Sequence, residues 1–336
     1  MKTAAMTAMT AVRSESMAEN KAYIVTDENV GVRLDVFAAA AAGISRTAAA
    51  RMADAGEILV NGAPAVKKTP LRAGDTVTLT LSPAAPCELA PENIPLDIIY
   101  EDDDIIVINK PSGMVVHPGA GNENGTLVNA LLYHCGGSLS GVGGVTRPGI
   151  VHRIDRQTSG LICAAKNNSA HISLSGQLAA HSMRRIYEAL LVGYPAEDVG
   201  TIDVPIGRDV RDRIKMSASP RAAAAREAVT DYRVKSRLVS PENEKFALVE
   251  CRLHTGRTHQ IRVHMAYIHH PVAGDETYGA GRTKFERAHR ELFDGQCLHA
   301  MRLILTHPRT GEEMEFSAPR PEGMEKIIGM MREDMS

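Results

Sequence analysis

The chain contains no tryptophan, and only 4% of its 336 residues are aromatic. A platform of stacked aromatic side chains for single-stranded nucleic acid is therefore not expected. No apolar run approaches the roughly 20 residues that a membrane-spanning helix needs, so we expect no membrane association. The 5 cysteines are scattered and form no CxxC pair. This usage favours a reducing, cytoplasmic compartment over a disulfide scaffold.

An excess of charge of one sign is also missing. The 38 Lys and Arg residues stand against 40 Asp and Glu residues, which gives a net charge of -2. A nucleic-acid site would therefore have to come from local clustering of basic residues. The P-loop motif is absent, and His259 and His264 are five residues apart with no adjacent Glu, which is not the spacing of a zinc helix. We therefore expect no metal.

Composition divides the chain into five parts. Residues 1–20 are rich in Ala, Met, Thr and Ser and are expected to form a disordered tail; whether they are ordered or processed stays open. Residues 21–82 form a small module, and residues 83–95 form a linker kept extended by four prolines. A larger domain follows at residues 96–325, and residues 326–336 are expected to be a C-terminal tail.

The small module is predicted to contain helices at about 32–42 and 45–55 and strands at about 57–60 and 77–81. Four basic residues lie on its second helix or in the loop after it, and together they could form a face for phosphate groups. An ordinary solvated face is the alternative. The four residues are Arg46, Arg51, Lys67 and Lys68.

The most informative stretch is GIVHRIDRQTSGL at residues 149–161. It places Asp155 between Arg153 and Arg156, and positive charge beside a carboxylate favours the ionised form. An ionised carboxylate held by arginine can serve as a nucleophile or a base. A surface ion pair of little energetic value is the alternative reading of this fragment alone.

Three further stretches carry polar residues in unusual positions. Lys110 ends a predicted strand, and Tyr187 lies within a predicted strand at residues 184–192, where a core tyrosine is the default. The sequence HTGRTHQIRVHM at residues 254–265 offers donors from Arg257, Gln260 and Arg262 that suit a carboxylate, a phosphate or a base edge.

Three consecutive aspartates at residues 102–104 could suggest a metal site. They lie between two predicted strands, at 98–100 and 105–108. Because no further cluster of ligand residues accompanies them in the sequence, we interpret them as an acidic turn.

Four stretches occur in a fixed order: INKPSGMVVHPG, GIVHRIDRQTSGL, RRIYEALLVG and LHTGRTHQIRVH. Together they resemble the RluA/RluD family of RNA pseudouridine synthases over residues 93–320. The small module resembles the alpha-L RNA-binding domain first known from a ribosomal protein. The resemblance implies an α+β fold with a mixed, mostly antiparallel sheet and flanking helices.

The resemblance also implies an activity. Members of the family isomerise selected uridines to pseudouridine in structured RNA, and they need neither cofactor nor metal. Large-subunit (23S) ribosomal RNA is the favoured target, although some relatives modify transfer RNA. We expect a monomer. A non-catalytic RNA-binding protein on the same fold is the alternative, but such a protein would not need to keep the catalytic residues together.

The resemblance assigns roles to residues at matching positions. Asp155 matches the catalytic aspartate, and Tyr187 matches the tyrosine that stacks on the target base. Arg262 is the expected ion-pair partner of Asp155, with Arg257 as the other candidate. The expected substrate contacts are Arg153, Lys110, Arg257, His259 and Gln260. The sequence does not choose between attack at C1′, attack at C6 and deprotonation at C2′.

Overall fold

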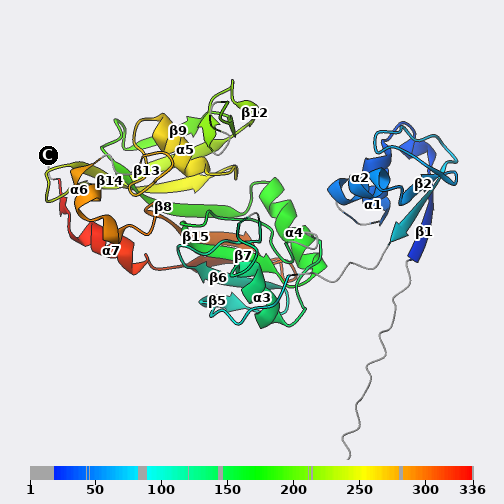
Figure 1. Ribbon diagram of the computed structural model, residues 1–336, viewed down its shortest axis with the longest axis horizontal. Coiled ribbons are helices and arrows are strands. Elements are labelled where there is room, and N and C mark those ends of the chain that lie inside the picture. Colours follow the sequence, from blue (N-terminus) through cyan, green and yellow to red (C-terminus); the bar gives the residue numbers. More distant parts are fainter. Residues whose placement is uncertain are drawn as a thin grey trace, which may run out of the picture. The chain divides into compact units, whose positions relative to one another are not determined.

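The computed structural model of the protein describes residues 19–42, 44, 46–81, 89–119, 121–142, 147–210, 212, 215–279 and 283–334. The chain divides into two compact units between residues 88 and 89, and each unit has its own sheet (Figure 1). Nearly all of the predicted tail at 1–20, and the part of the predicted linker before residue 89, lie outside the described residues. None of the described helices is long and apolar enough to cross a membrane.

The N-terminal unit is an antiparallel sheet in the order β1-β4-β2-β3, with two helices packed on it. Its buried core joins Leu34 and Phe37 of the first helix to Ile58, Val77 and Leu79 of the sheet. Both predicted helices and both predicted strands are present, and the structure adds β1 and β3. The elements are β1 (Glu19–Ile24), η1 (Asp27–Asn29), α1 (Leu34–Ala42), α2 (Arg46–Asp54), β2 (Ile58–Val60), β3 (Ala63–Pro64) and β4 (Thr76–Leu81).

The C-terminal unit holds the remaining elements. Its helices are α3 (Leu127–Cys135), α4 (Asn168–Ala179), α5 (Gln260–Tyr267), α6 (Lys284–Ala288), η2 (Arg290–Leu292) and α7 (Glu322–Gly329). Its strands are β5 (Ile98–Glu101), β6 (Ile105–Lys110), β7 (Ser159–Ala165), β8 (Arg184–Val192), β9 (Val199–Asp203), β10 (Ile206–Arg208), β11 (Met216–Ala218), β12 (Ala223–Arg226), β13 (Val229–Val239), β14 (Lys245–Leu253), β15 (Leu298–Thr306), β16 (Glu313–Ser317) and β17 (Arg332–Glu333).

Most of these strands form one large sheet, in the order β17-β13-β14-β8-β15-β7-β6-β5, with β16 and β9 as side branches. Among the described pairings, β7 with β15 is parallel and the others in this sheet are antiparallel. The predicted mixed, mostly antiparallel sheet is therefore confirmed.

Helices cover both faces of this sheet, which explains why β6 is apolar at successive positions from Ile105 to Ile108. Alternate residues of β6 enter different cores: Ile106 and Ile108 pack with residues of α3, α5 and α7, whereas Ile105 and Val107 pack with residues of α4. Successive side chains of a strand point to opposite faces, so a strand covered on both sides needs apolar residues at every position.

A separate three-stranded sheet, β11-β10-β12, lies beside α5. A small apolar cluster joins Ile206 of β10 to Val263 of α5, with Met216 of β11 and Tyr278 packed against it. This contact brings the sheet next to the helix that carries Arg262.

Two predicted segment boundaries are wrong. The expected C-terminal tail at 326–336 contains the second half of α7, whose Met324 and Ile327 are buried in the main core, and β17, which pairs with β13. The second half of the linker expected at 83–95 is already bound to α3. The Asn129 side chain donates to the carbonyl oxygen of Ala90, and the amide of Glu92 donates to the carbonyl oxygen of Asn129.

Candidate active site

Asp155 lies in the loop that leads into β7 and faces a cleft of about 510 Å³. The loop is anchored on either side, because Ile154 is buried in the main core and the amide of Thr158 donates to the carbonyl oxygen of Asp155 at 3.1 Å. The Asp155 side chain keeps 24% of its surface exposed. The carboxylate is therefore held in place and still open to a ligand.

Arg262, in the first turn of α5, holds this carboxylate. Its Nη1 donates to Asp155 Oδ2 at 2.9 Å. The rest of the guanidinium is occupied by Asp275, because Nε donates to Oδ2 at 2.7 Å and Nη2 donates to Oδ1 at 2.9 Å. Although burial acts in the opposite direction, Asp275 and Asp155 together raise the pKa of Arg262 above its ordinary value. Arg262 is thus a fixed positive charge between two acids.

The geometry separates the two arginines that were candidates for this pair. Arg257 does not contact Asp155; its Nε donates to the carbonyl oxygen of Glu227 at 2.8 Å. Arg262 makes the ion pair, as the sequence favoured. Arg257 instead lines a smaller pocket of about 60 Å³ that also contains Asp155 and Arg262.

Tyr187 belongs to this smaller pocket. It lies on β8, is 5% exposed, and lines the pocket with Leu253 and Ile261. Burial is the main cause that raises the pKa of Tyr187, and the nearby Asp155 carboxylate adds to it while Arg185 opposes it. Its hydroxyl is therefore neutral at physiological pH, and the pocket offers a flat aromatic ring beside the carboxylate.

His259 is the next polar group along the cleft. Its Nε2 lies 4.0 Å from Asp155 Oδ1, and its Nδ1 is 2.9 Å from the hydroxyl of Tyr278. That hydroxyl also accepts the backbone amide of Met216 in β11 at 3.0 Å. His259 has a φ of 56°, an uncommon conformation for a residue with a side chain that often marks functional positions. Met216, Tyr278 and His259 therefore connect the three-stranded sheet to the cleft.

The other expected substrate contacts divide into two groups. Arg153 is exposed at the cleft and donates to the Thr258 hydroxyl at 2.9 Å, so it remains available to a ligand. Gln260 does not: it is 3% exposed, donates to Val229 and Thr230, and accepts from Thr255 and the amide of Arg257. All of its bonding capacity is used inside the protein, although it is among the residues that line the smaller pocket. Its contact with substrate stays a prediction.

Lys110 is also enclosed by the protein, and its side chain is fully buried. Its Nζ donates to three backbone carbonyl oxygens, those of Pro111 at 2.7 Å, Met114 at 2.9 Å and Arg156 at 3.0 Å. Burial lowers the pKa of Lys110 to about 7, while the Asp155 carboxylate acts in the opposite direction. Lys110 therefore fixes the segment next to Asp155, and its contact with substrate stays a prediction.

The basic residues of the N-terminal unit are partly committed to acids. Arg46 is paired with the buried Asp35, and Lys67 is paired with Asp54. Arg51 and Lys68 are exposed. Although burial acts in the opposite direction, Arg33 and Arg46 lower the pKa of Asp35. The role of Arg46, Arg51, Lys67 and Lys68 in RNA binding stays a prediction.

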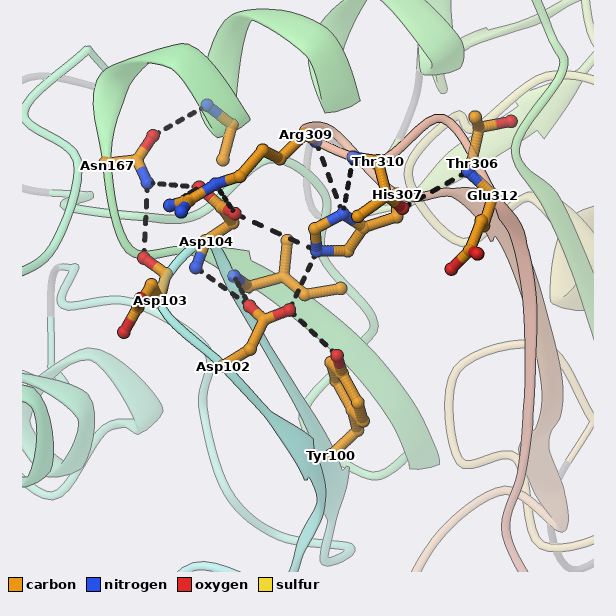
Figure 2. Close-up of polar contacts among 12 residues, drawn as sticks. Tyr100, Asp102, Asp103, Asp104, Asn167, Thr306, His307, Arg309, Thr310 and Glu312 are labelled. Atoms are coloured by element: carbon orange, nitrogen blue, oxygen red, sulfur yellow. Dashed lines mark hydrogen bonds and ion pairs between the residues drawn. The ribbon is translucent and has the colours of Figure 1, made fainter.

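The acidic turn at 102–104 has a partner that the sequence did not reveal. His307, 205 residues away, brings Nε2 within 2.8 Å of Asp102 Oδ2, and Arg309 holds Asp104 (Figure 2). Asp102 also accepts from Tyr100 and from the amides of Asp104 and Ile105.

The oxygens of Asp102 and Asp104 are thus already bound to protein donors. The amides of Arg309 and Thr310 donate to His307 Nδ1, which directs Nε2–H toward Asp102. The arrangement fastens the turn between β5 and β6 to the turn between β15 and β16.

Comparison with known proteins adds independent information. A family model described as RNA pseudouridylate synthase matches residues 104–267, and the model of the S4 domain matches residues 32–77. The uncharacterized RNA pseudouridine synthase YlyB of Bacillus subtilis is 46% identical over 310 residues, covering 92% of this chain and 97% of that protein. Ribosomal large subunit pseudouridine synthase D of Zymomonas mobilis is 42% identical over 316 residues, covering 91% and 96%.

A solved structure has a similar fold. Human RNA Pseudouridylate Synthase Domain Containing 1 superposes with a TM-score of 0.57 at 26% identity, covering 72% of this chain and 90% of that one.

Proposed function

Because this chain belongs to the RNA pseudouridine synthases, we propose that it isomerises specific uridines of large-subunit (23S) ribosomal RNA and that Asp155 is the catalytic carboxylate. The ribosomal target is supported by the relative from Zymomonas mobilis, which is named for the ribosomal large subunit. It is supported as well by the S4 domain that precedes the catalytic unit. An enzyme with this target would act in the cytoplasm.

One observation carries the assignment of Asp155. Asp155 lines the cleft, and its Oδ2 is held by Arg262. Among the described residues, the partner recorded for Oδ1 is His259 Nε2, at 4.0 Å. A carboxylate with one oxygen fixed and the other open can attack the substrate or take a proton from it. Tyr187 lies in the adjoining pocket, where its ring would lie against a base that has left the RNA stack.

The surrounding residues suit a flipped-out nucleotide. Arg153 is exposed at the junction of the cleft and the smaller pocket, and it lines both. Its guanidinium can stabilise the RNA from which the base has left, by contact with phosphate or by stacking. The N-terminal unit would add phosphate contacts, which provide affinity and not sequence reading.

The test pairs Asp155→Asn with Asp103→Asn, the same substitution at an exposed position in the acidic turn. Large-subunit ribosomal RNA labelled with [5-³H]uridine would report isomerisation by tritium release. Asp155→Asn should fold and release no tritium, and Asp103→Asn should match the unsubstituted enzyme. Normal release by Asp155→Asn would refute the role of Asp155.

Pseudouridine mapping of RNA from cells with and without the gene would test the ribosomal target separately.

A further inference from the structure

Arg185 is a buried charged residue that the site described so far does not use. It lies on β8 two positions before Tyr187. Because alternate residues of a strand share a face, the two side chains lie next to each other, and both line the pocket of about 60 Å³ beside Asp155. Arg185 is 9% exposed, although its neighbour Arg184 is solvent-accessible and pairs with Glu313.

The Arg185 guanidinium has little bonding within the protein. Its Nη2 has a long contact of 3.4 Å to the carbonyl oxygen of Thr255, and its Nε is buried with no hydrogen-bond partner among the described residues. In the part of the chain that the structure describes, no carboxylate forms an ion pair with it. A buried guanidinium normally has an acid partner, because removing a charge from water without compensation is costly. Arg185 therefore presents unused donors at the pocket.

The surroundings keep this positive charge uncompensated. His152 is buried nearby and accepts the amide of Cys163, and burial together with the charge of Arg185 lowers the pKa of His152 to about 3. The nearest acid in the pocket is Asp155, whose Oδ2 is already held by Arg262. Gly256 leaves room for the guanidinium, because a Cβ at that position would lie 2.7 Å from Arg185 Nη1.

We propose that Arg185 is a catalytic residue that binds the carbonyl oxygens of the target uracil and stabilises the negative charge that the base acquires when it leaves the sugar. The proposal rests on the placement of the active site at Asp155.

The chemistry requires such a group. When the N1–C1′ bond breaks, its electron pair stays with the base, and the uracil anion spreads this charge over N1, O2 and O4. The rotated base then uses an electron pair to form the C5–C1′ bond, C5 loses its proton, and N1 gains one. No atom or electron is gained overall. Fixed donors aimed at the oxygens where charge develops lower the barrier, and removing one such donor typically costs about 10²- to 10³-fold in rate.

A phosphate is the other acceptor that Arg185 could bind. A phosphate contact would hold substrate and transition state equally, so its loss would raise KM and leave kcat unchanged. Stabilisation of the leaving uracil would instead appear in the rate of the chemical step. The two roles therefore predict different kinetics.

The experiment compares the unsubstituted enzyme with Arg185→Met and Arg185→Lys on large-subunit ribosomal RNA transcribed with uridine or with 5-fluorouridine. Loss of the original N-glycoside is measured in single turnovers by nuclease digestion and mass spectrometry. Fluorine withdraws electrons and makes the uracil anion easier to form. It therefore replaces part of the stabilisation of this anion that Arg185 provides.

With uridine RNA, Arg185→Met should be slower by about 10²-fold. With 5-fluorouridine RNA the defect should shrink at least about tenfold, since each tenfold change corresponds to about 1.4 kcal/mol of barrier. Arg185→Lys keeps the charge and loses the fork, so its defect should be smaller and should shrink in the same way.

Three results would overturn the proposal: equal defects on both RNAs, a rise in KM at constant kcat, or unchanged kinetics. If Arg185→Met does not fold, the Arg185→Lys comparison decides alone. If the unsubstituted enzyme converts no uridine of this RNA, the ribosomal target is wrong, and the comparison moves to whichever RNA is found by mapping.

Discussion

The bond between Arg262 and Asp155 provides the sharpest test of the active site, and Arg262→Ala and Arg262→Lys are the two perturbations. Arg262→Ala removes three charge-assisted hydrogen bonds of 2.7–2.9 Å. It also leaves Asp275, which is fully buried, with the backbone amides of Thr277 and Tyr278 as donors. Removing one partner of a buried pair costs about 3–5 kcal/mol of unfolding free energy. Arg262→Lys keeps the charge but cannot hold both carboxylates in the same fork, so its cost should be smaller.

Activity should fall in the same order. Loss of the fork lets Asp155 move, and a displacement near 1 Å can reduce the rate by about 10²-fold, which we expect for Arg262→Lys. Arg262→Ala should lose at least ten times more, because no cation then holds Asp155 at the cleft. Arg257→Ala should act more on RNA binding than on the rate of the chemical step.

Asp275→Asn separates this mechanism from direct RNA contact. Asp275 is fully buried, so it cannot touch RNA. It accepts two of the three hydrogen bonds that the Arg262 guanidinium donates. The substitution should lower kcat about tenfold or more with little change in KM, because a loosened Arg262 no longer fixes Asp155. Asp103→Asn is the matched control. Single-turnover rates over a range of RNA concentrations give the maximal rate and its dependence on RNA, and urea unfolding gives the free energy of unfolding. Full activity in Asp275→Asn, or a larger loss of single-turnover rate in Arg257→Ala than in Arg262→Ala, would refute the reasoning.

Three further changes test other parts of the molecule. Lys110→Met removes three hydrogen bonds to carbonyl oxygens and should lower the free energy of unfolding in urea by about 2–4 kcal/mol. Turnover should be lost while RNA affinity stays unchanged. A stable and active variant would contradict the positioning role. Although burial acts in the opposite direction, hydrogen bonds from backbone amides, Tyr100 and His307 lower the pKa of Asp102 to about 2 from an ordinary 3.8. The ionised Asp102 therefore stabilises the fold fully above pH 3.8, and this stabilisation is lost as the pH falls through 2. Asp102→Asn should therefore destabilise the protein at pH 6 by about 1–3 kcal/mol and much less near pH 2, and an equal loss at both pH values would exclude this account. A chain that begins at Leu89 should keep turnover at high RNA concentration and bind RNA more weakly at moderate salt, whereas unchanged affinity would show that the N-terminal unit does not bind this RNA.

The sequence predicts well what lies close together along the chain. The helices and two of the strands of the N-terminal unit follow from local periodicity, and β8 lies where alternation placed it, at residues 184–192. Asp155, Tyr187 and Arg262 were recognisable because each lies inside a distinctive short motif, and the structure brings all three to adjoining pockets.

What the sequence could not show is which distant residues meet. Asp275 binds Arg262 across 13 residues, and His307 reaches Asp102 across 205 residues, with no periodic signal in either case. Polarity alone also gives no measure of burial. Lys110 ends its strand and resembled an exposed cation, but β6 lies between β5 and β7 with both faces covered, so its ammonium turns inward to carbonyl oxygens. Gln260 is likewise buried, and its side chain bonds to groups inside the protein.

The placement of Arg262 makes the active site depend on three separate segments. Asp155 comes from the loop before β7, Arg262 from α5, and Asp275 from the loop that follows α5. A single guanidinium joins all three, and its Nη1 is the donor that reaches the partly exposed Asp155 carboxylate. The buried pair with Asp275 already fixes the plane of the guanidinium, so little reorganisation is needed when substrate enters. Any change that displaces either loop should therefore impair catalysis before it unfolds the sheet, because the pair with Asp155 tolerates less movement than the apolar core does.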